Sequence, residues 1–253
     1  MSRRQPWTAS WSHNDEDRDR PLLDALEHGC AWIEPDVWVV DDRVLIGHDR
    51  PDESQSFEAV YLDPLRQRRD ELPDLYLVLD VKSEPEASLP VIQSLLAAYD
   101  DVLTHASGGT VVRRPVTVVL SGTLANRVAM QADSVLLTYD GRLGNVPERA
   151  VADWMPLVSA SWRDHFWWRG FGPILRRDRA RLAELVSETH EAGLRLRFWS
   201  LPEWTPWHRT RLWRTLLDAG VDVITTDHPA ALAQVLRERD AGHQDVSRGR
   251  PSS

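Results

Sequence analysis

Two stretches of the sequence carry acids or a histidine where buried strands would otherwise be apolar. One is Trp32–Val40, which contains Glu34 and Asp36, and the other is Val44–His48. Residues two apart on a strand point to the same face, so we expect Glu34 and Asp36 to lie side by side. Adjacent carboxylates repel each other unless a cation offsets the repulsion. Oxygen-ligated Mg²⁺ or Ca²⁺ is the simplest such cation, and the pair therefore predicts one divalent metal ion.

A third apolar run repeats this pattern. It begins at Leu75 and ends with Asp80 and Lys82, which share one face of the expected strand. Asp80 is a candidate third metal ligand, and Lys82 is a candidate point charge for an anionic substrate oxygen. His13 and His48 each end a strand-like stretch. We therefore expect two imidazoles, three carboxylates and one ammonium group near strand ends.

Composition narrows the class of protein. The chain has 253 residues, of which 42% are hydrophobic, so it can bury a full core. Its formal net charge of -9 gives no general positive electrostatic field that would attract nucleic acid. The lone Cys30 cannot form a disulfide framework. No apolar region follows Arg3 and Arg4, and no run of about 20 apolar residues occurs. We therefore expect no transmembrane segment and a cytoplasmic location.

Apolar runs of strand length alternate with amphipathic stretches of helix length, which implies a parallel sheet. About eight such units predict an α/β protein with a closed (β/α)₈ TIM barrel, a single domain over residues 7–239, and a disordered polar tail over residues 240–253. The expected strands are Thr8–Ser12, Glu34–Val40, Val44–His48, Leu75–Lys82, Val116–Leu120, Ser134–Thr138, Leu157–Ser161, Leu194–Ser200 and Val221–Thr226. The expected helices are Arg20–Gly29, Phe57–Glu71, Leu89–Leu103, Arg209–Ala219 and Ala230–Arg239. The polar residues fall near the C-terminal strand ends, where such barrels carry active sites, and Asp227–Pro229 is interpreted as a turn and helix start.

The order of these residues resembles the glycerophosphodiester phosphodiesterase superfamily, which includes spider-venom sphingomyelinase D and is related to phosphatidylinositol phospholipase C. The superfamily has a His after the first strand, a Glu-x-Asp pair on the second, a His-Asp soon after, and an acid-x-Lys on the third. The matching residues are His13, Glu34 and Asp36, His48-Asp49, and Asp80 and Lys82.

The sequence departs from typical glycerophosphodiesterases at several positions. These enzymes have His-Arg-Gly where this chain has His13-Asn14-Asp15, so the arginine that would help to hold a phosphate is missing. Asp80 replaces the more usual Glu, which is similar to the sphingomyelinase D pattern. The opening His-Asn-Asp and the stretch Arg20–Leu26 resemble the altered inheritance of mitochondria protein 6-like branch of the superfamily.

The resemblance implies a metal-dependent phosphodiesterase that acts on a small-molecule or lipid-derived phosphodiester. One of His13 and His48 would deprotonate the attacking oxygen while the other protonates the leaving group, since imidazoles titrate near neutral pH. Lys82 would bind a phosphate oxygen, and Trp199 resembles a late-strand tryptophan of the superfamily that contacts substrate. The implied metal ligands are Glu34, Asp36 and Asp80.

Three functional classes remain open. The first is hydrolysis of a glycerophosphodiester or related phosphodiester, and the second is a sphingomyelinase D-like or phospholipase C-like lyase reaction that gives a cyclic phosphate. The third is a non-catalytic barrel that binds a phosphorylated ligand. Glycoside hydrolysis also uses paired carboxylates, but it gives no role to Lys82 and two histidines. The sequence does not choose between Mg²⁺ and Ca²⁺ or name the alcohol.

The sequence contains twelve tryptophans, and several lie in loops expected on the active face. These side chains could bind a choline group through cation–π contacts, stack on a sugar, or form a rim for peripheral membrane contact. They could also pack the loops onto the barrel. The tryptophans concerned are Trp162, Trp167 and Trp168 after the sixth strand, and Trp204 and Trp207 after the seventh.

Overall fold

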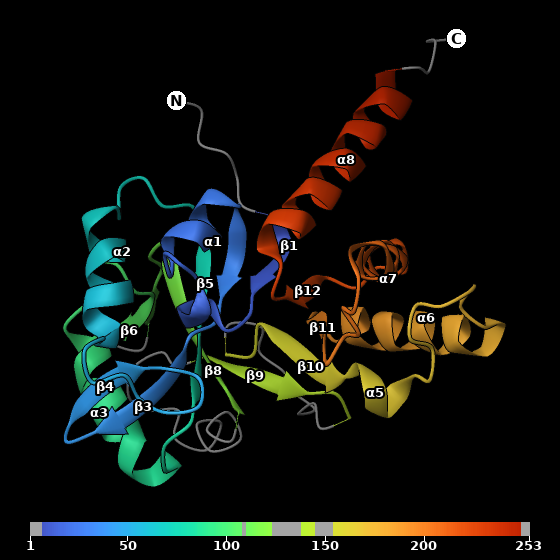
Figure 1. The fold of residues 1–253 in the computed structure, drawn as a ribbon. Coiled ribbons are helices and arrows are strands. Elements are labelled where there is room, and N and C mark those ends of the chain that lie inside the picture. The colour runs from blue at the N-terminus through green and yellow to red at the C-terminus, as the bar shows by residue number, and fades with distance from the viewer. Residues whose placement is uncertain (1–6, 108–109, 123–137, 145–153, 249–253) are drawn as a thin grey trace.

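The main sheet of the computed structural model closes on itself as a barrel of parallel strands (Figure 1). The structure describes residues 7–107, 110–122, 138–144 and 154–248, with side chains described to residue 242. Around the barrel each strand pairs with the next and the last pairs with the first, which confirms the predicted (β/α)₈ architecture. The barrel strands are β1 (Trp7–Ser12), β2 (Cys30–Ile33), β5 (Leu75–Val81), β8 (Val116–Ser121), β9 (Thr138–Arg142), β10 (Leu157–Ser161), β11 (Arg195–Trp199) and β12 (Val223–Thr226).

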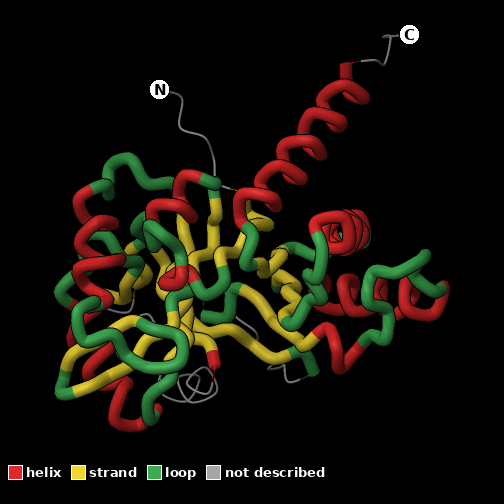
Figure 2. The backbone as a smooth tube through the Cα atoms, in the orientation of Figure 1, coloured by secondary structure: helices red, strands yellow, loops and turns green. Residues whose placement is uncertain are grey.

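Helices pack around the outside of the barrel (Figures 1 and 2). Two buried apolar clusters lie between the strands and this helical layer, one for each half of the chain. Helix α6 was not predicted from the sequence. The helical elements are η1 (Asp15–Asp17), α1 (Leu23–Glu27), the π-helical turn η2 (Glu58–Leu62), α2 (Asp63–Gln67), α3 (Pro85–Ala97), α5 (Trp162–His165), α6 (Arg176–Glu191), α7 (Pro206–Asp218) and α8 (Pro229–Arg248).

Two hairpins are added to the barrel. Strands β3 (Asp36–Val40) and β4 (Arg43–Ile46) pair antiparallel, and β3 also continues beside β5. The predicted strand Val44–His48 is therefore not a barrel strand, because its counterpart β4 pairs only with β3 within the main sheet. Asp41 and Asp42 connect the two strands, and both residues have the positive φ of a two-residue hairpin turn. A second hairpin joins β6 (His105–Ser107) to β7 (Thr110–Val112).

Successive side chains along each barrel strand point alternately into the barrel interior and toward the helical layer. In β5, Leu77, Leu79 and Val81 join the outer apolar cluster, whereas Val78 belongs to an interior cluster. Asp80 and Lys82 have the same parity as Val78, so the strand directs them inward toward the rim. The interior apolar cluster is formed by Trp11, Ala31, Trp32, Val78, Val119, Leu157 and Val223.

Two predicted segments reach the limits of the described residues. Thr138 begins β9, but the rest of the predicted strand Ser134–Thr138 lies outside them. Helix α8 continues past the boundary predicted at residue 240 and ends at Arg248, and residues 249–253 are outside the described part. The predicted domain limits and disordered tail therefore stay predictions. Within the described residues, no helix combines the length and apolar character needed to cross a bilayer.

Asp15 fixes the segment that follows β1. It is fully buried and accepts hydrogen bonds from the Ser12 hydroxyl at 2.7 Å, the Leu22 backbone N–H at 2.6 Å and the Tyr61 hydroxyl at 3.0 Å. Leu22 has a φ of 62°, a conformation that is strained for a branched residue. The carboxylate thus holds a strained backbone position and the turn that contains His13.

We predict that Asp15→Ala lowers the free energy of unfolding by about 2–4 kcal/mol, because it leaves buried donors without an acceptor. Urea denaturation of both proteins measures the difference. Asp17→Ala is the matched control, since Asp17 is an exposed acid of the same turn and should change stability by less than about 0.5 kcal/mol. Equal stability of the Asp15→Ala and control proteins would contradict the role assigned to Asp15.

Candidate functional site

His13 and Asp227 meet at the rim although 214 positions separate them in the sequence. They follow β1 and β12, which pair in parallel with Ser12 opposite Thr226. Nδ1 of His13 lies 2.8 Å from Oδ1 of Asp227. The Arg18 guanidinium donates to the backbone carbonyl oxygens of His13 at 2.8 Å and of Asp227 at 2.7 Å. These contacts orient the imidazole and leave its Nε2 as the nitrogen for proton transfer.

Asp36 is the centre of a second group of charged side chains. It is 1% exposed, and its Oδ2 lies 2.7 Å from Nδ1 of His48 and 3.0 Å from Nζ of Lys82. Nζ of Lys82 also lies 2.7 Å from Oδ2 of Asp80. Asp36 and Asp80 are partners in the parallel β3–β5 register, which explains why one ammonium group bridges both carboxylates.

The backbone at Gly47 brings His48 to Asp36. Gly47 has a φ of +147°, and a Cβ there would lie 2.2 Å from the carbonyl oxygen of Arg50, so only glycine fits this turn. The Gly47 backbone N–H donates to the Asp36 carbonyl oxygen at 3.2 Å, and its carbonyl accepts from Nε1 of Trp38 at 2.7 Å. The hairpin end is therefore held against the start of β3.

Glu34 has different partners from Asp36. It is 4% exposed, and its Oε2 accepts a hydrogen bond from Nε1 of Trp11 at 2.6 Å and lies 3.6 Å from a guanidinium nitrogen of Arg197. Arg197 is 3% exposed, lies 3.7 Å above the Trp11 ring and contacts Asp140 at 3.2 Å. Glu34 thus belongs to a charged layer inside the barrel, stacked on the aromatic side chains below it.

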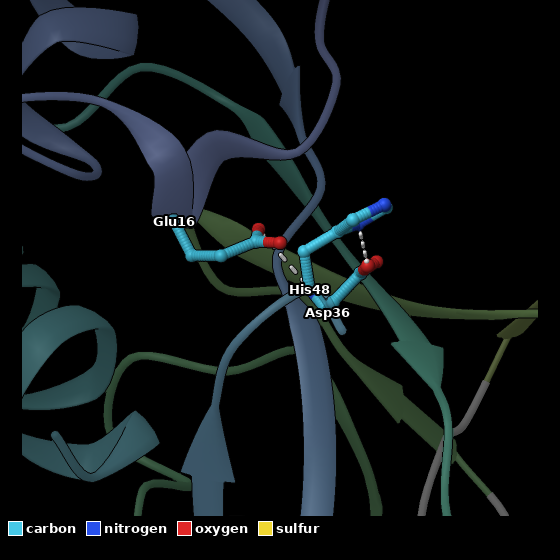
Figure 3. A group of neighbouring side chains, drawn as sticks. All are labelled: Glu16, Asp36 and His48. Atoms are coloured by element: carbon cyan, nitrogen blue, oxygen red, sulfur yellow. Dashed lines mark hydrogen bonds and ion pairs between the residues drawn. The ribbon is translucent and has the colours of Figure 1, made fainter. Parts of the chain in front are cut away.

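Glu16 lies beside Asp36 and His48 (Figure 3). Within the described residues, these three form a group whose ligand atoms all lie within 4.8 Å of one another. Oε2 of Glu16 accepts from the backbone N–H of Asp36 at 3.1 Å. Oε1 of Glu16 and Oδ1 of Asp36 are buried without a hydrogen-bond partner. Two unpartnered carboxylate oxygens suit a hard divalent cation, so the residues present fit the predicted metal ion.

The pKa shifts of the carboxylates agree with this donor set. Burial raises the pKa of Glu16 to about 7, and the nearby charge of Asp36 adds to the rise. Burial also raises the pKa of Asp36 despite the hydrogen bond from Lys82, and raises that of Glu34 despite the attraction of Arg197. The protein's own cations therefore do not offset the burial of these acids. A divalent cation bound by Glu16 and Asp36 would lower the pKa values of both.

The structure brings together most of the residues selected from the sequence. Asp36, His48, Asp80 and Lys82 are linked by direct contacts, whereas the side-by-side pairing expected for Glu34 with Asp36 is replaced by separate partners. Trp199 ends β11 and keeps 40% of its surface exposed at the rim.

Sequence reasoning missed four residues of the site. Arg197 shares the interior face of β11 with Trp199, two positions later, so strand alternation could have identified it. Asp227 follows β12 directly, and it could have been predicted to lie near His13 because strand ends are close together in a closed barrel. The other two, Glu16 and Arg18, lie in and after the turn η1, where a polar sequence gives no sign of partial burial.

Comparisons with known proteins confirm the predicted resemblance. A family model described as an AIM6-like phosphodiesterase domain matches residues 4–73. Altered inheritance of mitochondria protein 6 of Eremothecium gossypii is 28% identical over 88% of this chain and 68% of its own length. A homolog of that protein from Arthroderma benhamiae is 27% identical over 85% of this chain and 80% of its own length.

Solved structures confirm the fold. A putative glycerophosphoryl diester phosphodiesterase from Silicibacter pomeroyi superposes with a TM-score of 0.54 and 15% identity, covering 94% of this chain and 95% of its own. A glycerophosphoryl diester phosphodiesterase from Parabacteroides distasonis gives a TM-score of 0.57 and 15% identity, covering 94% of this chain and 88% of its own. The chain therefore shares the barrel fold of these two structures.

The contacts of His13 predict its titration. Burial lowers its pKa, but the Asp227 hydrogen bond and the charges of Glu34 and Asp227 outweigh burial, so the net pKa lies above 6.5. The same bond lowers the pKa of Asp227 below 3.8. The contribution of His13 to the stability of the folded protein is complete below pH 6.5 and is lost as the pH rises through the folded-state pKa. The contribution of Asp227 is complete above pH 3.8 and is lost as the pH falls through its folded-state pKa.

We predict that Asp227→Asn lowers the pKa of His13, as measured by an NMR pH titration of its ring, with His13→Ala used to assign the signal. Asp222→Asn is the matched control, because Asp222 pairs with His190 at 2.8 Å, so its removal should leave the His13 titration unchanged. An unchanged His13 titration in Asp227→Asn would show that the carboxylate does not set its charge.

Proposed function

We propose that the chain is a metal-dependent phosphodiesterase that cleaves a glycerophosphodiester or related phosphodiester by acid–base catalysis with His13 and His48. One observation carries the proposal. Each histidine has its Nδ1 held by a carboxylate, that of Asp227 for His13 and that of Asp36 for His48. This arrangement fixes each ring and leaves Nε2 for proton exchange with a bound substrate.

The proposed reaction needs one proton acceptor and one proton donor. One imidazole takes the proton from the attacking hydroxyl or water as its oxygen bonds to phosphorus. The other imidazole gives a proton to the leaving oxygen as the second phosphorus–oxygen bond breaks. The raised pKa of His13 keeps it protonated more of the time near neutral pH, which favours it as the donor. His48 is then the acceptor in the first step.

The group of side chains around Asp36 would neutralise the negative charge of the substrate phosphate. Lys82 is partly exposed, with 27% of its side chain accessible, so its ammonium group can contact a phosphate oxygen while it remains bonded to Asp80. Trp199 would contact the alcohol portion of the substrate from the end of β11. Mg²⁺ or Ca²⁺ would be held by Asp36 with Glu34, Asp80 and the additional carboxylate of Glu16, and when bound it would stabilise negative charge on the phosphate.

We predict that isothermal titration calorimetry detects one divalent cation per chain and that Asp36→Asn weakens its binding at least about tenfold. Glu16→Gln should also weaken binding, because its unpartnered oxygen faces the same group. Glu27→Gln is a matched control, since Glu27 is an exposed acid on α1 paired with Arg20. Wild-type affinity in Asp36→Asn would contradict the proposed metal site.

We predict that His13→Ala and His48→Ala each lower kcat for glycerophosphocholine or bis(p-nitrophenyl) phosphate by about 10²–10⁴-fold, because each removes a proton-transfer group. His190→Ala is the matched control, since His190 pairs with Asp222, whose carboxylate accepts from the Leu196 backbone N–H near the start of β11, at the end of that strand opposite to the rim. Circular dichroism and cation binding confirm that the variants are folded. Wild-type turnover in both rim variants would refute the proposed catalytic pair.

A further inference from the structure

Large apolar side chains are exposed in one region of the described chain. Six are exposed, and all lie between residues 167 and 207, at the end of β11 or in the segments that follow β10 and β11 (Figure 1). Trp199 is the member at the end of β11, already assigned to substrate. We call the other five the aromatic surface, and their exposed fractions run from 53% for Leu175 to 84% for Trp167. The aromatic surface consists of Trp167, Phe171, Leu175, Trp204 and Trp207.

Other aromatic side chains of the same segments hold the loops in place. Trp162 is fully buried, stacks on Phe166 at 4.1 Å and donates from Nε1 to the Trp168 carbonyl oxygen at 2.8 Å. Trp168 is 7% exposed and donates to the Phe171 carbonyl oxygen at 3.0 Å. Packing therefore accounts for Trp162 and Trp168, as one interpretation of the sequence expected, but it does not account for Trp167 between them.

The two loops form one surface with a rigid base. Phe171 and Trp204 come from different loops, and their ring centroids lie 5.6 Å apart. Both rings also pack on His208, at 4.7 Å and 5.1 Å, and His208 is 1% exposed. Phe171 and Trp204 are thus held in position before any partner binds, which reduces the entropy lost on docking.

Arginines are frequent in the two segments that carry the aromatic surface, in a chain that is acidic overall. Residues 163–179 contain five arginines and two aspartates, and residues 199–211 contain two arginines and one glutamate, whereas the whole chain has a net charge of -9. Asp178 pairs with the neighbouring Arg177 at 3.4 Å, and the partly buried Glu203 accepts hydrogen bonds from Thr226 and Trp213. The two segments together still carry seven arginines against three acids. The local excess of positive charge matches an anionic partner.

The aromatic surface is connected to the candidate site. Glu203, next to Trp204, accepts a hydrogen bond at 2.9 Å from the hydroxyl of Thr226, the last residue of β12. The next residue, Asp227, holds His13. The two loops also leave the barrel at its C-terminal strand ends, the end at which His13 lies. A partner bound to the aromatic surface would therefore sit beside the opening of the site.

We propose that the aromatic surface docks the barrel rim onto an anionic lipid bilayer. Tryptophan and phenylalanine partition into the interface between headgroups and acyl chains, and flanking arginines bind anionic headgroups. Arg211, whose guanidinium lies 5.6 Å from the Trp207 ring, places a cation at headgroup level beside an inserted ring. The proposal goes beyond the phosphodiesterase reaction, because docking is measured without turnover.

Sedimentation of the 253-residue chain with vesicles tests the proposal. The chain should bind vesicles of equimolar phosphatidylcholine and phosphatidylserine more strongly than vesicles of phosphatidylcholine alone, and added salt should weaken the binding. The double substitution Trp167→Ser with Trp207→Ser should reduce the partition coefficient at least about tenfold, because it removes two inserting rings. Arg176→Glu should weaken binding to the mixed vesicles, whereas the control Arg237→Glu, an exposed arginine of α8, should not.

Three outcomes would overturn the proposal. The first is an absence of binding to both vesicle types, and the second is binding that the double tryptophan substitution leaves unchanged while its melting temperature matches the wild type. The third is concentration-dependent self-association that the same substitution abolishes, which would assign the aromatic surface to a second copy of the chain. Equal binding to neutral and mixed vesicles would overturn the anionic part of the assignment.

Discussion

Strand β1 pairs in parallel with β2 on one side and β12 on the other, and this closure of the barrel assembles the candidate site. It places the segment after β1 beside the segment after β12, so that His13 meets Asp227 across 214 residues of sequence. The parallel β3–β5 register performs the same task for Asp36 and Asp80. Because all barrel strands run in one direction, these side chains converge at one rim without long loops to carry them.

Buried charge is the second constraint on the molecule. Glu34 and Arg197 lie inside the barrel on an aromatic layer, and the carboxylates of Asp36 and Glu16 lie above them with pKa values raised chiefly by burial. Ionised carboxylates are costly in such surroundings unless cations neutralise them. Lys82 supplies part of this charge, and the unpartnered oxygens of Asp36 and Glu16 are consistent with a divalent cation supplying the rest.

Much of this arrangement could be predicted from the sequence. Strand alternation shows which residues share a face, and the strand ends of a barrel lie close to one another. These two patterns predicted the barrel and the shared strand face of Asp80 and Lys82. The hairpin was misassigned as a barrel strand, although the two-residue turn at Asp41 and Asp42 cannot connect parallel strands and was a usable signal. The partial burial of Glu16 had no such signal, because it follows from the tertiary packing around η1 rather than from any periodic pattern.

The central claim is that this rim cleaves phosphodiesters with the help of a divalent cation. The most direct test strips the protein with EDTA, adds glycerophosphocholine, and follows the reaction by phosphorus NMR before and after Mg²⁺ or Ca²⁺ is restored. The account predicts no turnover in the stripped protein and a new phosphomonoester or cyclic phosphate signal once the cation is present. Full turnover without any cation would contradict the metal requirement. Failure to cleave this or any other phosphodiester, despite bound cation, would contradict the catalytic assignment itself.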